Sequence, residues 1–142
     1  MKDCNLFSLC THKEWPQPRK YLSSDAAKQE KKSNIMYRGD YGRTCLQQAC
    51  CRGAPDDIIK TMIDIGGKEL VMKIDNDERT ALHSACMNGA SYDIIKMLIE
   101  VGGRDLVLAE DDDGDTALHY LCWSIEEDND AAEDQILMQV AF

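Results

Sequence analysis

Apolar residues recur at helical spacing in two kinds of segment along the chain. In the stretch TALHSACMNG, Leu82, Ala85 and Cys86 fall on one stripe of a short helix. In the stretch SYDIIKMLIEVGG, the apolar residues within 94–101 form the broad face that is typical of a longer amphipathic helix. The pair Gly102-Gly103 follows at once and predicts a left-handed stop to that helix.

These two segments repeat along the chain with a period of 36 residues. Thr44, Thr80 and Thr116 share this spacing, and residues 43–76 match residues 79–112 at 17 of 34 positions. Each Thr is expected to cap the short helix that follows it. Polar, turn-rich segments such as RDLVLAEDDDGD are expected to connect one unit to the next. Helix, turn, helix and long loop, repeated at a fixed period, indicate an all-α solenoid.

The repeated residues resemble the signature of the ankyrin-repeat family. TALHSACMNGA and DGDTALHYLC are similar to the family pattern T-P-L-H-x-A-A-x-x-G, and the resemblance covers roughly residues 35–142. It implies antiparallel helix pairs stacked side by side, with β-hairpin-like loops projecting at right angles. It also implies a concave face, made by the loop tips and first helices, that binds protein partners. The chain departs from the pattern at Ala81 for Pro, Gln47 for the first His and Glu78 for a hairpin Gly.

The resemblance divides the chain into a repeat domain and an N-terminal arm. We expect residues 1–34 to form a disordered or irregular basic arm, in which CNLFSLCTH carries free thiols. The repeat domain then covers residues 35–142, with units at about 41–76, 77–112 and 113–142, the last incomplete. Within it, DQILMQVAF resembles the second helix of the third unit. Neither end shows an evident polar cap, so we expect marginal stability and self-association through the uncapped ends.

Composition and charge narrow the class of protein. The 142 residues are 44% apolar and carry a net charge of −10, which suits one modest folded domain. Residues 1–43 hold nine Lys/Arg and five Asp/Glu, whereas residues 44–142 hold seven and twenty-one. This acidic body disfavours nucleic acid as a partner, and no apolar run approaches the ~18 residues of a membrane span. Seven cysteines without a signal peptide predict thiols in an intracellular protein, in the cytoplasm rather than the nucleus.

Two histidine–cysteine pairs, His83/Cys86 and His119/Cys122, raise the question of a metal or catalytic site. A zinc site needs about four ligands that converge on one point, whereas stacked repeats place equivalent residues ~10 Å apart. The pairs recur because the unit recurs, so we interpret them as structural, with each Cys acting as a small buried residue. DDDGD at 111–115 lacks the spacing of a calcium loop and is interpreted as an acidic hairpin tip. We therefore predict no catalytic residue, cofactor or metal. One alternative is a metal-binding or enzymatic protein that uses the Cys/His content. Another is a fragment of a larger ankyrin-repeat protein.

The family resemblance also indicates which residues face a partner, namely the hairpin tips and the variable positions late in each first helix. These candidates are Tyr41, Arg43, Arg52, Asn76, Asp77, Arg79, Met87, Asn88, Asp112, Asp113, Asp115 and Trp123. Because carboxylates dominate the second and third tips, we predict a protein partner with a basic surface. Trp123 is expected to anchor that partner, since exposed Trp is enriched at binding hot spots. The alternative is that Trp123 packs against the C-terminal segment.

Overall fold

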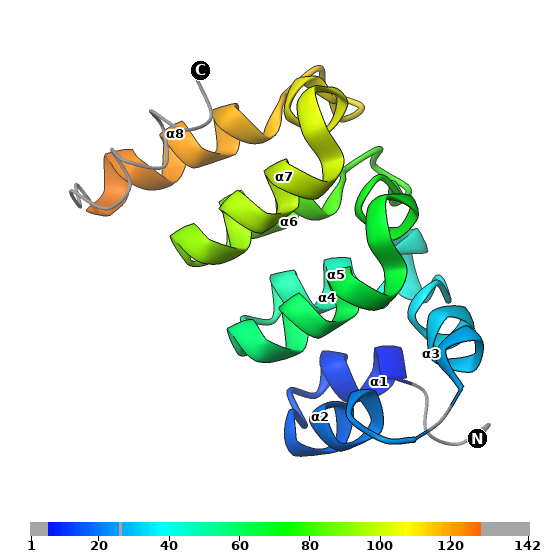
Figure 1. The fold of residues 1–142 in the computed structure, drawn as a ribbon. Coiled ribbons are helices and arrows are strands. Elements are labelled where there is room, and N and C mark those ends of the chain that lie inside the picture. Colours follow the sequence, from blue (N-terminus) through cyan, green and yellow to red (C-terminus); the bar gives the residue numbers. More distant parts are fainter. Residues whose placement is uncertain (1–5, 26, 129–142) are drawn as a thin grey trace.

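Helices make up most of the chain that the computed structural model describes, which is residues 6–25 and 27–128. In chain order they are α1 (Leu6–Thr11), α2 (Pro16–Leu22), α3 (Lys28–Ile35), the short 3-10 helix η1 (Asp40–Gly42), α4 (Cys45–Cys51), α5 (Asp56–Val71), α6 (Ala81–Met87), α7 (Tyr92–Leu108) and α8 (Ala117–Asp128). Helices α1, α4, α6 and α8 contact one another in succession, and α2, α5 and α7 form a second layer beside them (Figure 1). The predicted all-α solenoid of stacked helix pairs is confirmed.

The first helix of each repeat starts at the predicted threonine. The backbone N–H of Gln47 donates to Oγ1 of Thr44 at 3.2 Å, and the Thr44 N–H donates to Oε1 of Gln47 at 2.8 Å. Thr80 and His83 form the same reciprocal capping box, in which His83 Nδ1 accepts from the Thr80 N–H at 3.1 Å. These bonds satisfy N–H groups that a helix start otherwise leaves unpaired, and so they define where each helix begins.

The predicted stop at each glycine pair is a kink rather than an end. Gly67 and Gly103 have φ values of 63° and 71°, but the chain returns to helical geometry after each, within α5 and α7. The turn-rich connection expected directly after the glycines is therefore wrong for its first residues. A Cβ on Gly66 would lie 2.5 Å from the fully buried Leu70, so the glycine makes room for that leucine to fold back. Burying such a side chain contributes about 1.5–3 kcal/mol, which explains the added turn.

The N-terminal segment is helical and packed, and thus differs from the disordered or irregular arm expected for residues 1–34. Helix α1 contacts α4, and α2 and α3 contact α5, so these three helices stack on the repeats as one more unit. Leu6, Phe7, Cys10 and Leu22 are buried in the common core. The stack therefore begins with a folded unit rather than with the first hairpin.

This N-terminal unit follows the repeat pattern at a different spacing from the rest of the chain. Leu6 and Leu46 are both buried on a first helix, and Lys13 and Gly53 both take a positive φ, 58° and 70°, after it. Each pair is 40 residues apart, whereas the later units are 36 apart, so the 36-residue period did not reveal the unit. The buried Lys31 donates from Nζ to two backbone carbonyls, which satisfies its charged group.

Hairpin-like loops connect the later units, as the resemblance implies. Isolated antiparallel bridges join Arg38 to Thr44 and Glu110 to Thr116. The loops lie together at one end of the tiers (Figure 1). Among the described helices none is long and apolar enough to cross a bilayer. The segment DQILMQVAF, predicted as a second helix of the third unit, lies outside the described residues.

Candidate binding surface

The hairpin tips form a row along one end of the stack. The backbone N–H of Asn76, in the second hairpin, donates to the carbonyl of Tyr41 in the first at 2.9 Å. The N–H of Asp112, in the third hairpin, donates to the carbonyl of Asp77 in the second at 3.0 Å. These bonds hold four of the sequence-predicted contact residues in one line, at fixed spacing from unit to unit.

A buried carboxylate closes the second and third hairpins from inside. Asp75 accepts at Oδ1 from the N–H groups of Asp77 and Arg79, each at 2.9 Å. Asp111 makes the two equivalent bonds in the third hairpin, at 3.0 and 2.9 Å. The sequence pattern predicts both Asp75 and Asp111 to belong to the acidic tips, but each side chain is turned inward and the residues are 4% exposed. Their spacing of 36 was the only signal that could have indicated this structural role.

The two hairpin arginines are partly committed to the interior of the loops. Arg79 Nε lies 3.9 Å from the carboxylate of Asp111, and its guanidinium lies 5.8 Å from the ring of Tyr120. The Tyr120 hydroxyl donates to the carboxylate of Asp111. Burial alone would raise the pKa of Asp111, but this bond and the backbone amides outweigh it, so the pKa is lowered. Arg43 Nε lies 4.0 Å from the buried carboxylate of Asp75, and its guanidinium lies 5.2 Å from the exposed ring of Tyr41. Only the outer part of either arginine is therefore free to meet a partner.

His83 has a structural role that occupies both ring nitrogens. Its Nδ1 accepts from the N–H of its capping Thr, so Nε2 carries the proton and donates to the carbonyl of Asp115 at 2.9 Å. Gln47 reaches the following hairpin in the same way, with Nε2 donating to the carbonyl of Arg79 at 2.6 Å. Burial lowers the pKa of His83 and raises the pKa of the Cys86 thiol to about 12. This geometry leaves His83 no lone pair for a metal and leaves Cys86 unreactive.

One group of carboxylates in the described residues has oxygens close enough together to suggest a cation site. Asp111, Asp113 and Asp115 bring one oxygen each within 4.8 Å of the others. However, Asp111 uses Oδ1 for two backbone amides and Oδ2 for the Tyr120 hydroxyl. The cluster is therefore accounted for by the closure of the hairpin.

All twelve predicted contact residues are either exposed or half-buried. Exposed are Tyr41, Arg52, Asn76, Met87, Asn88, Asp112, Asp113 and Trp123, and half-buried are Arg43, Asp77, Arg79 and Asp115. Trp123 is 50% exposed and meets the ring of Tyr120 edge-on, with centroids 5.2 Å apart. This places the indole beside the third hairpin, because Tyr120 bonds to that hairpin. Tyr37, which the repeat pattern did not indicate, is 51% exposed and has no aromatic counterpart in the later units.

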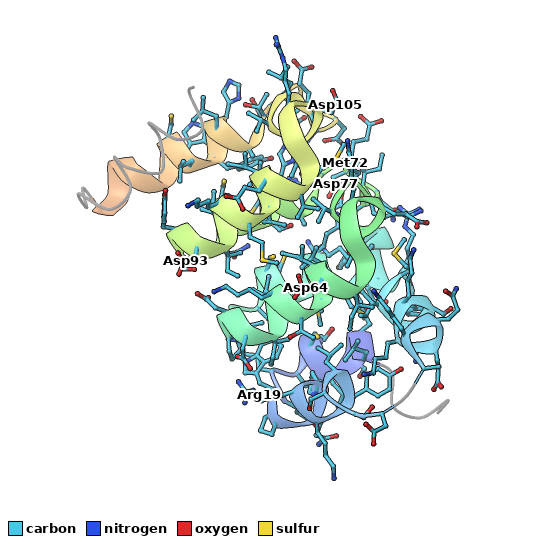
Figure 2. The ribbon with its side chains drawn as sticks, viewed as in Figure 1. Arg19, Asp64, Met72, Asp77, Asp93 and Asp105 are labelled. Atoms are coloured by element: carbon cyan, nitrogen blue, oxygen red, sulfur yellow. The ribbon has the colours of Figure 1, made fainter. Side chains whose placement is uncertain are left out.

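Negative charge gathers at the second and third tips. Desolvation and the neighbouring carboxylates of Asp113 and Asp77 raise the pKa of Asp112. Figure 2 shows Asp77 at the hairpin end of the stack, whereas Asp64 lies on α5 in the second layer. Repulsion among these groups would be relieved by a cationic neighbour, so the tips favour a basic surface over an acidic one.

Comparison with known proteins agrees with this architecture. Two overlapping matches to the family model for ankyrin repeats (3 copies) cover residues 19–107 and 46–133. Among solved structures, the ankyrin repeat domain of Bcl-3, titled a unique member of the IkappaB protein family, is similar at 20% identity with a TM-score of 0.70. That match covers 96% of this chain and 56% of the Bcl-3 chain, so this chain spans little more than half of that structure. A search of curated proteins finds no match. Because the family model matches most of its length, the chain belongs to the ankyrin-repeat family.

Proposed function

We propose that this chain is a non-enzymatic protein-interaction module that binds a basic partner on its hairpin tips and first helices. Ankyrin repeats are generally protein–protein interaction modules, so the fold supports the class of function. The observation that carries the proposal is the row of tips, in which inter-hairpin bonds from Asn76 to Tyr41 and from Asp112 to Asp77 align exposed side chains. Trp123 lies at the end of this row and offers the largest apolar side chain on it.

The carboxylates and the indole would have different roles in binding. Exposed Asp112 and Asp113 attract a basic partner from a distance and raise its association rate, as charged patches do. Trp123 would be covered in the complex and slow dissociation, as central aromatic anchors do. The backbone of the tips is held by hydrogen bonds, so little ordering is needed on binding.

We also propose a cytoplasmic location, which the free thiols support. Cys10, Cys45, Cys50 and Cys86 are buried as free thiols within the described residues. Burial raises the pKa of Cys10 to about 12 and raises that of Cys50 as well. Thiols of this kind act as small core residues and persist in a reducing compartment.

The proposal is tested by isolating a partner with cross-linking and mass spectrometry and then measuring its binding kinetics. Trp123→Ala should weaken binding by at least ~2 kcal/mol, mainly through faster dissociation. Asp112→Lys with Asp113→Lys should mainly lower the association rate, and rising salt should do the same to the parent chain. Asp64→Lys with Glu100→Lys, which changes the same total charge at exposed positions of α5 and α7, is the control and should change the rate much less. Binding that is independent of salt and insensitive to these variants would refute the proposal.

A further inference from the structure

A second feature of the hairpin side is a recess at the N-terminal end of the row, away from Trp123. It has a volume of about 230 Å³ and lies between α1 and the first hairpin. The residues around it are Phe7, Ser8, Thr11, His12, Tyr37 and Asp40, together with the backbone of Gly39. None of these residues was among the contact positions expected from the family resemblance.

The recess follows from two replacements that occur together in the first unit. At the position where later hairpins carry the buried Asp75 and Asp111, the first hairpin has Gly39. Gln47 on α4 extends a polar side chain towards the next hairpin, but its counterpart on α1 is Phe7. A Cβ on residue 39 would lie 2.5 Å from ring atoms of Phe7. An aromatic floor thus replaces the carboxylate that closes the other hairpins.

The groups around the recess differ in whether they are free to bind a ligand. Thr11 Oγ1 donates to the carbonyl of Phe7 at 2.9 Å and accepts from the amide of Gln48 at 3.0 Å, so its bonding is complete. The Tyr37 ring is 51% exposed and meets Phe7 edge-on at 6.4 Å. Asp40 is exposed, and no ion pair of its carboxylate occurs among the residues that the structure describes.

The nearest basic side chain on the same hairpin does not neutralise this carboxylate. The guanidinium of Arg38 donates from Nε to the carbonyl of Gly42 at 2.9 Å and from Nη2 to the carbonyl of Ile74 at 2.6 Å. Its donors are therefore directed at the backbone of two hairpins. Besides the Ser8 hydroxyl and Nε2 of His12, whose Nδ1 bonds to the carbonyl of Ser8 at 2.8 Å, what remains is an aromatic wall beside one carboxylate. That wall and carboxylate together suit a cation on an apolar stem.

We propose that this recess binds the side chain of one arginine from the basic partner, and this inference rests on the proposed function. The aliphatic stem would lie against Phe7 and Tyr37, and the guanidinium would pair with the carboxylate of Asp40. The volume is below the roughly 300–1,000 Å³ of small-molecule sites, so it suits one side chain rather than a whole metabolite. The recess would fix one end of a bound segment, while Trp123 holds the other end.

The test is an NMR titration of the whole isotope-labelled chain with Nα-acetylarginine amide, using the uncharged Nα-acetylcitrulline amide as the matched probe. We expect arginine-dependent shifts at residues 7–12 and 37–40, and at least a fivefold weaker arginine affinity in Asp40→Asn. Tyr37→Leu should weaken binding in the same direction, whereas Asp64→Asn, on the far layer, should not.

Equal shifts with the citrulline probe, shifts confined to other residues, or equal loss in Asp64→Asn would overturn the arginine site. Such a result would leave the salt and Trp123 experiments unaffected, because they concern the opposite end of the row. The two proposals can therefore fail separately.

Discussion

Replacing Gly39 by alanine should destabilise the fold because the added methyl group has no room. Its φ of −94° is negative, so glycine is not needed there for a left-handed turn. The added Cβ, however, would lie 2.5 Å from Cδ1 and Cε1 of Phe7, well inside the ordinary carbon–carbon contact of ~3.5–4.0 Å. Phe7 is buried, so its ring must shift within a packed core, at a cost of about 1–3 kcal/mol.

The sign of this effect separates the steric explanation from the general effect of removing a glycine. Loss of unfolded-state entropy alone would make Gly39→Ala stabilising by roughly 0.4–1 kcal/mol. Urea unfolding followed by far-ultraviolet circular dichroism gives the free energy for the parent, Gly39→Ala, Phe7→Ala and the double variant. We expect a coupling of about 0.5–3 kcal/mol, because Phe7→Ala removes the clash. An unfolding midpoint in Gly39→Ala equal to or above that of the parent would refute the reasoning.

Two further predictions concern residues that vary between the repeats. Burial lowers the pKa of His83 from 6.5, so the unfolded chain binds the proton more readily and stability should fall as pH drops below about 6.5. His83→Gln, which copies Gln47, should retain the hydrogen bonds and reduce the loss of stability at low pH. Urea unfolding at about pH 7 and about pH 5.5 measures this, and an unchanged pH dependence would contradict the prediction. Glu78 has a φ of 60° where the third hairpin has Gly114, so Glu78→Gly should raise the free energy of unfolding by roughly 0.5–1 kcal/mol, and a lower urea midpoint would contradict this.

The repeat was predictable from sequence because two of its units share half of their residues at one fixed spacing, and the same dependence on spacing limited what else could be predicted. Thr80, His83 and the apolar stripes sit where their pattern indicates. The N-terminal unit was not predicted because it lies 40 residues, rather than 36, before the next unit. In addition, Phe7 replaces the polar residue of the repeat signature. The inward orientation of the Asp75 side chain could not be predicted from its residue type, since a carboxylate in a hairpin can equally face the solvent. It depends on two backbone amides that point at it only once the loop is closed.

The two ends of the described stack differ, and the difference bears on self-association. The N-terminal unit carries exposed polar residues, including Ser8, His12 and Lys13. Towards the other end, Ile99 and Leu118 are half-buried, whereas their counterparts Ile63 and Leu82 are 1% and 0% exposed.

Self-association, expected at both ends from the sequence, is therefore better assigned to the C-terminal side of the described stack, where apolar surface gathers. The acidic third hairpin lies on the same side, so two copies repel each other at low salt and approach more readily once the charge is screened. We expect the sedimentation coefficient to rise with salt, while the rate of association with a basic partner falls. Self-association that is strongest at low salt would show that it is driven by attraction between the basic N-terminal unit and the acidic tips instead.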